Sequence, residues 1–187
     1  MKSYTILAAF LTLSVTCSPT LYEKEIFYFF NNSEKPVTVV INNKVIGKLK
    51  PNYRHHDFYP VNTYNIEFKT DDKIIFQKTI KVEKTEDTNR HVFNMDGEKN
   101  YALIDISGFY EGGGVLGAFN NKNFPITERY IGQKYFKIDA RLKYINLIGD
   151  KIADSMGSFY TPFLLCDYSQ DIADNDEKII EHCLRHF

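Results

Sequence analysis

The sequence has no tryptophan, only three cysteines and almost no net charge, and each shortage narrows the functions open to it. Sugar-binding platforms often use tryptophan, so its absence disfavours a glycan site, although 13 tyrosines and 15 phenylalanines remain. The 23 basic and 24 acidic residues leave a net charge of -1, and no basic run occurs. A surface that neutralises phosphates needs positive charge, so nucleic acid is not expected as a partner.

Complete catalytic and phosphate-binding motifs are also lacking. No Gly-x-Ser-x-Gly elbow or recognisable serine triad occurs. The Gly112-Gly113-Gly114 triplet is not followed by Gly-Lys-Ser/Thr, so it predicts a turn or loop and not a phosphate-binding site. The sequence favours a protein with a non-catalytic binding or structural accessory role, and it predicts no cofactor. The alternatives are an envelope hydrolase whose site forms only in three dimensions and a glycan-binding protein.

What is present is the composition of a folded protein with one apolar run at its N-terminus. Hydrophobic residues make up 43% and charged residues 25% of the 187 residues, which is the globular range. Lys2 precedes a run of apolar and small residues, Tyr4–Thr16, that ends at Cys17. Because a spanning helix needs roughly 20 residues, this shorter run predicts an export signal over residues 1–16.

The segment Ser14-Val15-Thr16-Cys17 resembles the lipobox of bacterial lipoproteins. The resemblance implies cleavage before Cys17 and acylation of Cys17 with palmitate-type chains. Residues 17–24 would then tether the protein to a bilayer in the bacterial cell envelope, as an outer-membrane lipoprotein facing the periplasm or the surface. The membrane would be one partner, and another envelope protein or a glycan a second. The alternative is a secreted protein that is cut nearby and keeps Cys17 as an ordinary thiol.

The two remaining cysteines, Cys166 and Cys183, are candidates for a disulfide. Exported proteins fold in an oxidising compartment, where two thiols tend to pair. The alternative is a pair of buried, reduced cysteines that behave as small apolar residues.

Residues 25–98 show repeated period-two alternation with closely spaced turns, which predicts a β-sandwich-like domain. Asn42-Asn43 and Asp71-Asp72 are the expected hairpin turns. On the middle strand, Tyr64, Ile66 and Phe68 should share one face. The expected strands are Ile26–Asn31, Val37–Ile41, Lys44–Leu49, Thr63–Lys69, Lys73–Val82 and Arg90–Met95.

Within this domain, the strings VTVVINNKVIGKL and YPVNTYNIEFK resemble PEGA-like and related small β-sandwich modules of bacterial envelope proteins. The resemblance implies an accessory surface module.

Residues 99–187 predict a β-rich region that is closed by a C-terminal α-helix, so the whole chain should be mainly β. Tyr101–Ile106 alternates as a strand, and apolar residues from Phe136 to Tyr144 alternate with charged ones as a second strand. A helical pattern competes over residues 142–156, where we favour a strand and a turn. Ile179, Cys183 and Leu184 form one stripe of a helix over Asp176–Phe187, which Asp174, Asn175 or Asp176 could cap.

The sequence contains five histidines, a residue type that often acts as a metal ligand or catalytic base. His182 and His186 are four residues apart on the expected helix, but two ligands do not complete a zinc site. His55-His56-Asp57 would diverge on an extended segment, which favours a solvated edge. His91 begins a strand and has no visible partner in the sequence. The acidic residues near the C-terminus lack EF-hand spacing, so no metal site is predicted; they are Asp167, Asp171, Asp174, Asp176 and Glu177.

Overall fold

The computed structural model describes residues 23–85, 88–95, 99–106, 124–138, 144–147 and 162–185. The predicted signal, Cys17, the Gly112-Gly113-Gly114 triplet and His186 lie outside these residues. Within them no helix is long and apolar enough to span a membrane.

The described chain is mainly β, with three four-stranded sheets and one C-terminal helix, as predicted. The outer sheet has the order β3-β2-β5-β6, with bounds Lys44–Leu49, Val37–Ile41, Asn62–Thr70 and Lys73–Val82. The central sheet has the order β10-β7-β1-β4, with bounds Tyr135–Ile138, Arg90–Asn94, Lys24–Asn31 and Tyr53–Pro60. The third sheet has the order β11-β12-β8-β9, with bounds Tyr144–Leu147, Pro162–Tyr168, Asn100–Asp105 and Ile126–Tyr130. A short 3-10 helix, Gln170–Ile172, leads into α1, Asp176–Arg185.

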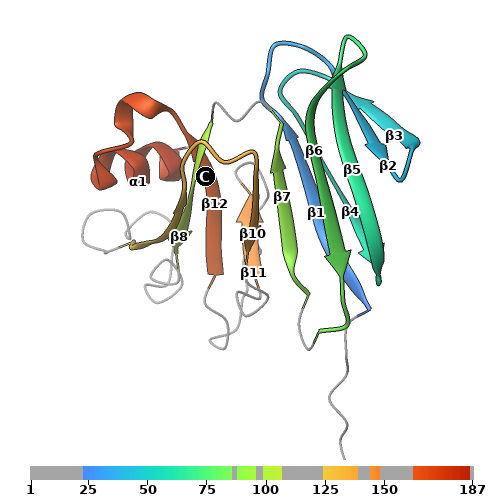
Figure 1. Ribbon diagram of the computed structural model, residues 1–187. Helices are drawn as coiled ribbons and strands as arrows, with labels where there is room; N and C mark the ends of the chain where they lie inside the picture. The colour runs from blue at the N-terminus through green and yellow to red at the C-terminus, as the bar shows by residue number, and fades with distance from the viewer. Residues whose placement is uncertain are drawn as a thin grey trace, which may run out of the picture.

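The three sheets and the helix stack in four layers, with the central sheet buried on both faces (Figure 1). On β1, Phe27 and Phe29 pack against the outer sheet, whereas Phe30 packs against the third sheet. Two buried faces explain why the strand is apolar almost throughout, IFYFF, instead of alternating. The ring of Phe30 stacks on that of Tyr101 with centroids 5.6 Å apart, which joins the second layer to the third.

Helix α1 covers the other face of the third sheet. Ile179, Cys183 and Leu184 are buried there, as the sequence predicts. Asn175 caps the helix, since its Oδ1 accepts a hydrogen bond from the Lys178 N–H at 3.0 Å. Cys183 is joined to Cys166 of β12 by a disulfide with Cα atoms 5.7 Å apart, so the helix is fastened covalently to the sheet.

The hairpin turns of the outer sheet follow the sequence prediction. Asn42 and Asn43 have φ of 49° and 63°, and Asp71 and Asp72 have φ of 51° and 61°. Asparagine and aspartate tolerate this left-handed region better than most residues, and two such residues in a row suit a tight hairpin. The predicted inward face is confirmed as well, because Tyr64, Ile66 and Phe68 are all buried.

Two sequence expectations need correction. The polar segment over residues 53–60 was not among the expected strands, yet it forms β4 at the edge of the central sheet. The single strand expected from Phe136 to Tyr144 is wrong: β10 ends at Ile138 in the central sheet, whereas β11 begins at Tyr144 in the third sheet. Alternation indicates a strand with one apolar face, but it does not indicate which sheet the strand joins. Because β10 lies in the predicted C-terminal region, residues 99–187, the central sheet combines strands from that region and from the predicted N-terminal domain, residues 25–98.

Candidate functional site

The chain passes from the outer sheet to the central sheet at a tight corner between β3 and β4. Lys50–Asn52 make this corner, and Asn52 has a φ of 53°. Among the described residues, both strands are sheet edges. A corner followed by two diverging edge strands leaves one side of the sandwich open.

The buried amide of Asn31 holds this corner in place. Its Nδ2 donates hydrogen bonds to the carbonyl oxygens of Lys35, Leu49 and Lys50 at 2.9, 3.0 and 3.0 Å. Its Oδ1 accepts a hydrogen bond from the Ser33 hydroxyl at 2.6 Å. The end of β1 is therefore tied to the end of β3 where β4 begins.

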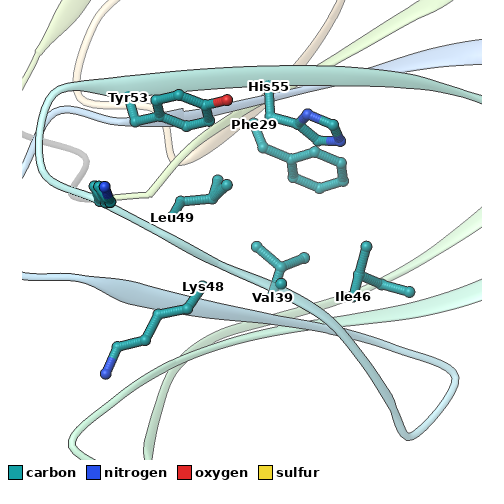
Figure 2. A pocket seen from close by; sticks show the side chains of 9 residues that line it. Phe29, Val39, Ile46, Lys48, Leu49, Tyr53 and His55 are labelled. Atoms are coloured by element: carbon teal, nitrogen blue, oxygen red, sulfur yellow. The ribbon is translucent and has the colours of Figure 1, made fainter.

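A cavity of about 390 Å³ lies between β3 and β4, partly open to solvent (Figure 2). Its volume falls at the lower end of the range for small-molecule sites, roughly 300–1,000 Å³. Tyr53, Phe29 and His55 lie along one side, and Val39 and Ile46 face them from the other (Figure 2). The nine lining residues are Phe29, Val39, Ile46, Gly47, Lys48, Leu49, Lys50, Tyr53 and His55.

The cavity exists because a glycine occupies an inward position of β3. Gly47 is the register partner of Val39, which is buried in the core between the sheets. Opposite residues of an antiparallel pair project to the same face, so a side chain at position 47 would enter the sandwich. A Cβ there would meet no other atom within 4 Å. The space that a larger residue would fill is left empty.

The polar groups of the cavity are three nitrogen-bearing side chains and one phenol, without a carboxylate. Lys48 and Lys50 are exposed, and Tyr53 is 49% exposed. The imidazole of His55 stacks on the Phe29 ring with centroids 6.4 Å apart. The Lys48 side chain points away from the apolar residues of the cavity (Figure 2), so the site is apolar with Tyr53 and His55 along one side.

The two adjacent histidines of β4 diverge, as expected for an extended segment. His55 lies opposite Phe29 and lines the cavity, whereas His56 lies opposite Tyr28 and is exposed. Asp57 is exposed on the same edge strand. The expected solvated edge is thus correct for His56 and Asp57, but His55 is half-buried.

A second polar cluster is centred on His91, for which the sequence showed no partner. Its Nε2 donates to Glu25 Oε2 at 2.6 Å, and its Nδ1 lies 2.9 Å from the Tyr135 hydroxyl. Asn89 Nδ2 donates to the other Glu25 oxygen. Glu25 is 2% and His91 3% exposed, and none of these residues lines the cavity between β3 and β4.

Burial raises the pKa of Glu25. The hydrogen bonds from His91 and Asn89, together with the charges of His91 and Lys137, lower the pKa by more than burial raises it. The net result is a pKa below the ordinary 4.5, so the carboxylate is ionised at neutral pH. Burial and the charge of Glu25 raise the pKa of Tyr135 to about 12, so its phenol keeps its proton. This is a satisfied buried network, in which each polar group has a partner.

The other candidate metal ligands from the sequence belong neither to the lining of the cavity nor to the cluster around His91. Asp167 pairs with Arg54 at 2.9 Å, which links the third sheet to β4, and Asp176 pairs with Arg129. His182 lies on α1, far along the chain from either cluster. Among the described residues, no group of three or more His, Cys, Asp or Glu could hold a metal ion.

Neither the cavity nor the Glu25–His91 pair is predicted by the sequence. The cavity had one signal, a glycine inside an otherwise regular strand, which often marks a close approach or a missing side chain. The pair had none, because Glu25 and His91 meet only through the parallel pairing of β1 with β7. Comparisons with protein-family models, curated proteins and solved structures found no match to this chain.

Proposed function

We propose that this protein is an exported, lipid-anchored envelope protein that acts as a non-catalytic accessory by binding a ligand in the cavity between β3 and β4. The observation that carries the proposal is the cavity itself, an apolar space of about 390 Å³ at an open edge of the sandwich. Ligand sites are typically concave, mostly apolar and equipped with a few convergent polar groups. This cavity has that composition.

The envelope location rests on the N-terminal segment. The apolar run Tyr4–Thr16 and the lipobox-like Ser14-Val15-Thr16-Cys17 support export and acylation of Cys17. The disulfide between Cys166 and Cys183 is consistent with folding in an oxidising compartment. The resemblance of residues 37–49 and 59–69 to PEGA-like modules supports an accessory role at the envelope.

A hydrolase was the main alternative, and the buried histidine disfavours it. His91 has a carboxylate neighbour, as a catalytic base would, but both groups are almost fully buried and neither lines the cavity. A catalytic base must reach the proton that it abstracts from a substrate. His55 does line the cavity, yet no carboxylate lines it with His55.

Binding of a neutral hydrophobic dye, Nile red, tests the cavity. Gly47→Phe should abolish the fluorescence increase, because the new ring would occupy the space beside Val39. Val45→Phe is the matched control: Val45 is 62% exposed on the same strand and does not line the cavity. Circular dichroism would verify that both variants fold. Equal dye binding by the two variants would place the dye elsewhere and refute the assignment.

Detergent phase partitioning tests the anchor separately. The mature wild-type protein should enter the detergent phase, and Cys17→Ser should shift it to the aqueous phase or leave an uncleaved precursor. An inhibitor of the lipoprotein signal peptidase should make the precursor accumulate. Aqueous partitioning of the untreated mature protein would contradict acylation and favour a secreted protein.

A further inference from the structure

We infer that two copies of this chain pair through β4, antiparallel and about a two-fold axis at His56, so that their four-stranded central sheets join into one sheet. This inference goes beyond the proposed binding function and does not depend on the ligand. Three observations support it. β4 is an unprotected edge, exposed apolar side chains gather beside it, and its charges complement one another in one register.

Strand β4 is the least protected sheet edge among the described residues. It keeps its register with β1 over all eight residues without a bulge, and it contains no lysine. The edge strands β3 and β6 contain lysines, and their pairings with β2 and β5 are irregular. β9 also pairs irregularly, whereas β10 and β11 have only four residues each. Lysines, bulges and short length keep sheet edges from pairing, and β4 has none of these protections.

The main chain of β4 directs its hydrogen-bonding groups outward at alternate residues. The Val61 N–H donates to the Glu23 carbonyl at 2.9 Å, which fixes the side of the strand that faces β1. These groups alternate along an antiparallel strand, so Arg54, His56 and Phe58 direct their N–H and carbonyl groups away from β1. His56 and Phe58 are exposed. A further antiparallel strand would form its hydrogen bonds with these residues.

Exposed apolar side chains gather along the same side of the sandwich. On β4, Tyr53 and Phe58 are about half exposed, at 49% and 54%, and Val61 directly after the strand is exposed as well. Val45 and Ile46 are exposed on β3, the edge strand across the cavity. Single exposed apolar residues are common, but a group of them at one place favours an interaction surface. A second β4 strand would pack beside Phe58 on one face of the sheet and beside Tyr53 on the other.

The charges of β4 select the register of the pair. Two registers overlap most of the strand: an axis at His56 pairs Tyr53–Tyr59 with itself, and an axis at Asp57 pairs Arg54–Pro60 with itself. Both place the outward-directed residues opposite one another, as an antiparallel ladder requires. The axis at Asp57 sets two carboxylates against each other, whereas the axis at His56 sets each Asp57 opposite the His55 of the second copy. Because like charges directly opposite each other destabilise a strand pair, the axis at His56 is favoured.

Pairing in this register would replace a local contact of the edge with contacts between the copies. In the single chain, Asp57 Oδ1 accepts a hydrogen bond from the Phe58 N–H at 2.8 Å. In the pair, this N–H would donate to the Arg54 carbonyl of the second copy, and the two His56 residues would exchange two main-chain hydrogen bonds. The exposed Asp57 carboxylate would then accept a hydrogen bond from the half-buried His55 imidazole of the second copy.

Sedimentation equilibrium of the purified full chain with Cys17→Ser, which carries no acyl chain, tests the pairing. This protein should form a dimer. Asp57→Lys or His55→Glu should each weaken the dimer Kd about two- to thirtyfold, because each change removes two favourable cross-strand pairs. The double variant should recover the dimer, since lysine and glutamate then lie opposite each other. Glu83→Lys is the matched control, because it reverses an exposed charge outside β4 and should leave the Kd unchanged.

Cysteine crosslinking tests the position of the axis. In the same background, His56→Cys should form a disulfide between two copies under mild oxidation, because directly opposite residues have Cα atoms about 5.5 Å apart. Phe58→Cys is the matched control on the same strand. Its two copies would be offset by four residues, or about 13 Å, which is too far for a disulfide. Cys166 and Cys183 are joined to each other and do not compete, so non-reducing electrophoresis reads the new bridge alone.

The outcomes separate this pairing from the proposed ligand site. A protein that sediments only as a monomer would overturn the inference and leave the cavity, tested by Nile red, unaffected. A dimer that is insensitive to Asp57→Lys would show that the copies meet through another surface. Crosslinking through Phe58→Cys and not through His56→Cys would show that the register is wrong. Loss of the dimer in both single charge variants and its recovery in the double variant would support the pairing.

Discussion

His91 Nε2 donates a hydrogen bond to Glu25 Oε2 at 2.6 Å across the parallel pair β1 and β7, in the most deeply buried histidine–carboxylate contact described in this chain. Two strands from distant parts of the sequence therefore meet through charge as well as through apolar packing. The ring of Phe27 packs edge-on against His91 with centroids 4.9 Å apart, so this polar contact lies directly beside the aromatic core.

Removing the carboxylate should destabilise the protein strongly. Glu25→Ala leaves His91 and Asn89 buried without their acceptor, and loss of one partner of a buried pair typically costs about 3–5 kcal/mol. Guanidinium unfolding would measure this change. The matched control is Glu23→Ala, which removes an exposed carboxylate paired with Lys84 and should leave the unfolding midpoint nearly unchanged. Similar midpoints for both variants would show that the buried pair contributes little.

The same carboxylate should make stability fall at acid pH. The folded state lowers the pKa of Glu25 below 4.5, so its contribution is complete above that value and is lost as the pH falls through the folded pKa. Between about pH 5 and pH 3, the wild-type protein should therefore lose more unfolding free energy than Glu25→Gln. Urea unfolding at several pH values would measure the two slopes. Parallel slopes would contradict a lowered pKa.

The Asn31 amide should be important for the corner that closes one end of the cavity. Asn31→Ala leaves the carbonyls of Leu49 and Lys50 without this donor, and such a loss costs about 1–3 kcal/mol. Asn32→Ala is the neighbouring control: it removes a single hydrogen bond to the Tyr101 hydroxyl, from a half-buried residue. Thermal unfolding should show the larger decrease for Asn31→Ala. The reverse order would mean that the corner is held by other contacts.

The disulfide should contribute through the loop that it closes. Cys166 and Cys183 are 17 residues apart, and in the chain-entropy model a loop of this length is worth about 3 kcal/mol. Replacing both cysteines with alanine should lower the unfolding free energy by about this amount. Intact mass spectrometry should show a gain of two hydrogen atoms when a thiol reductant converts the wild-type disulfide to two thiols. An unchanged mass would mean that the cysteines are not bridged.

Local pattern was sufficient to predict most of the first half of the fold. Val37–Ile41 and Lys44–Leu49 are strands with the predicted bounds, because β-branched residues flank an Asn-Asn pair that turns tightly. β4 was missed because its sequence, YRHHDFYP, is polar along an edge with one exposed face. Its strand conformation depends on pairing with β1, which lies 22 or more residues earlier in the chain.

The candidate site could not be predicted from local sequence pattern, because each residue that forms it is placed there by the register between two strands. Gly47 makes a cavity only because the register places it opposite Val39, and His55 lines that cavity only because it lies opposite Phe29. The terminal helix was easier to predict. Its apolar stripe and the Cys166–Cys183 spacing are visible in sequence, so both the buried face of α1 and the candidate bridge could be named.

The central claim is that the cavity beside Gly47 binds an apolar ligand, and methyl NMR tests this claim most directly. During titration with Nile red, the methyl signals of Val39, Ile46 and Leu49 should shift together and saturate with one ligand, because these side chains line the cavity. The exposed Ile74 and Ile131, which lie on other strands and loops outside it, should not shift. Shifts confined to Ile74 or Ile131, or no saturable shift at Val39, would contradict the account.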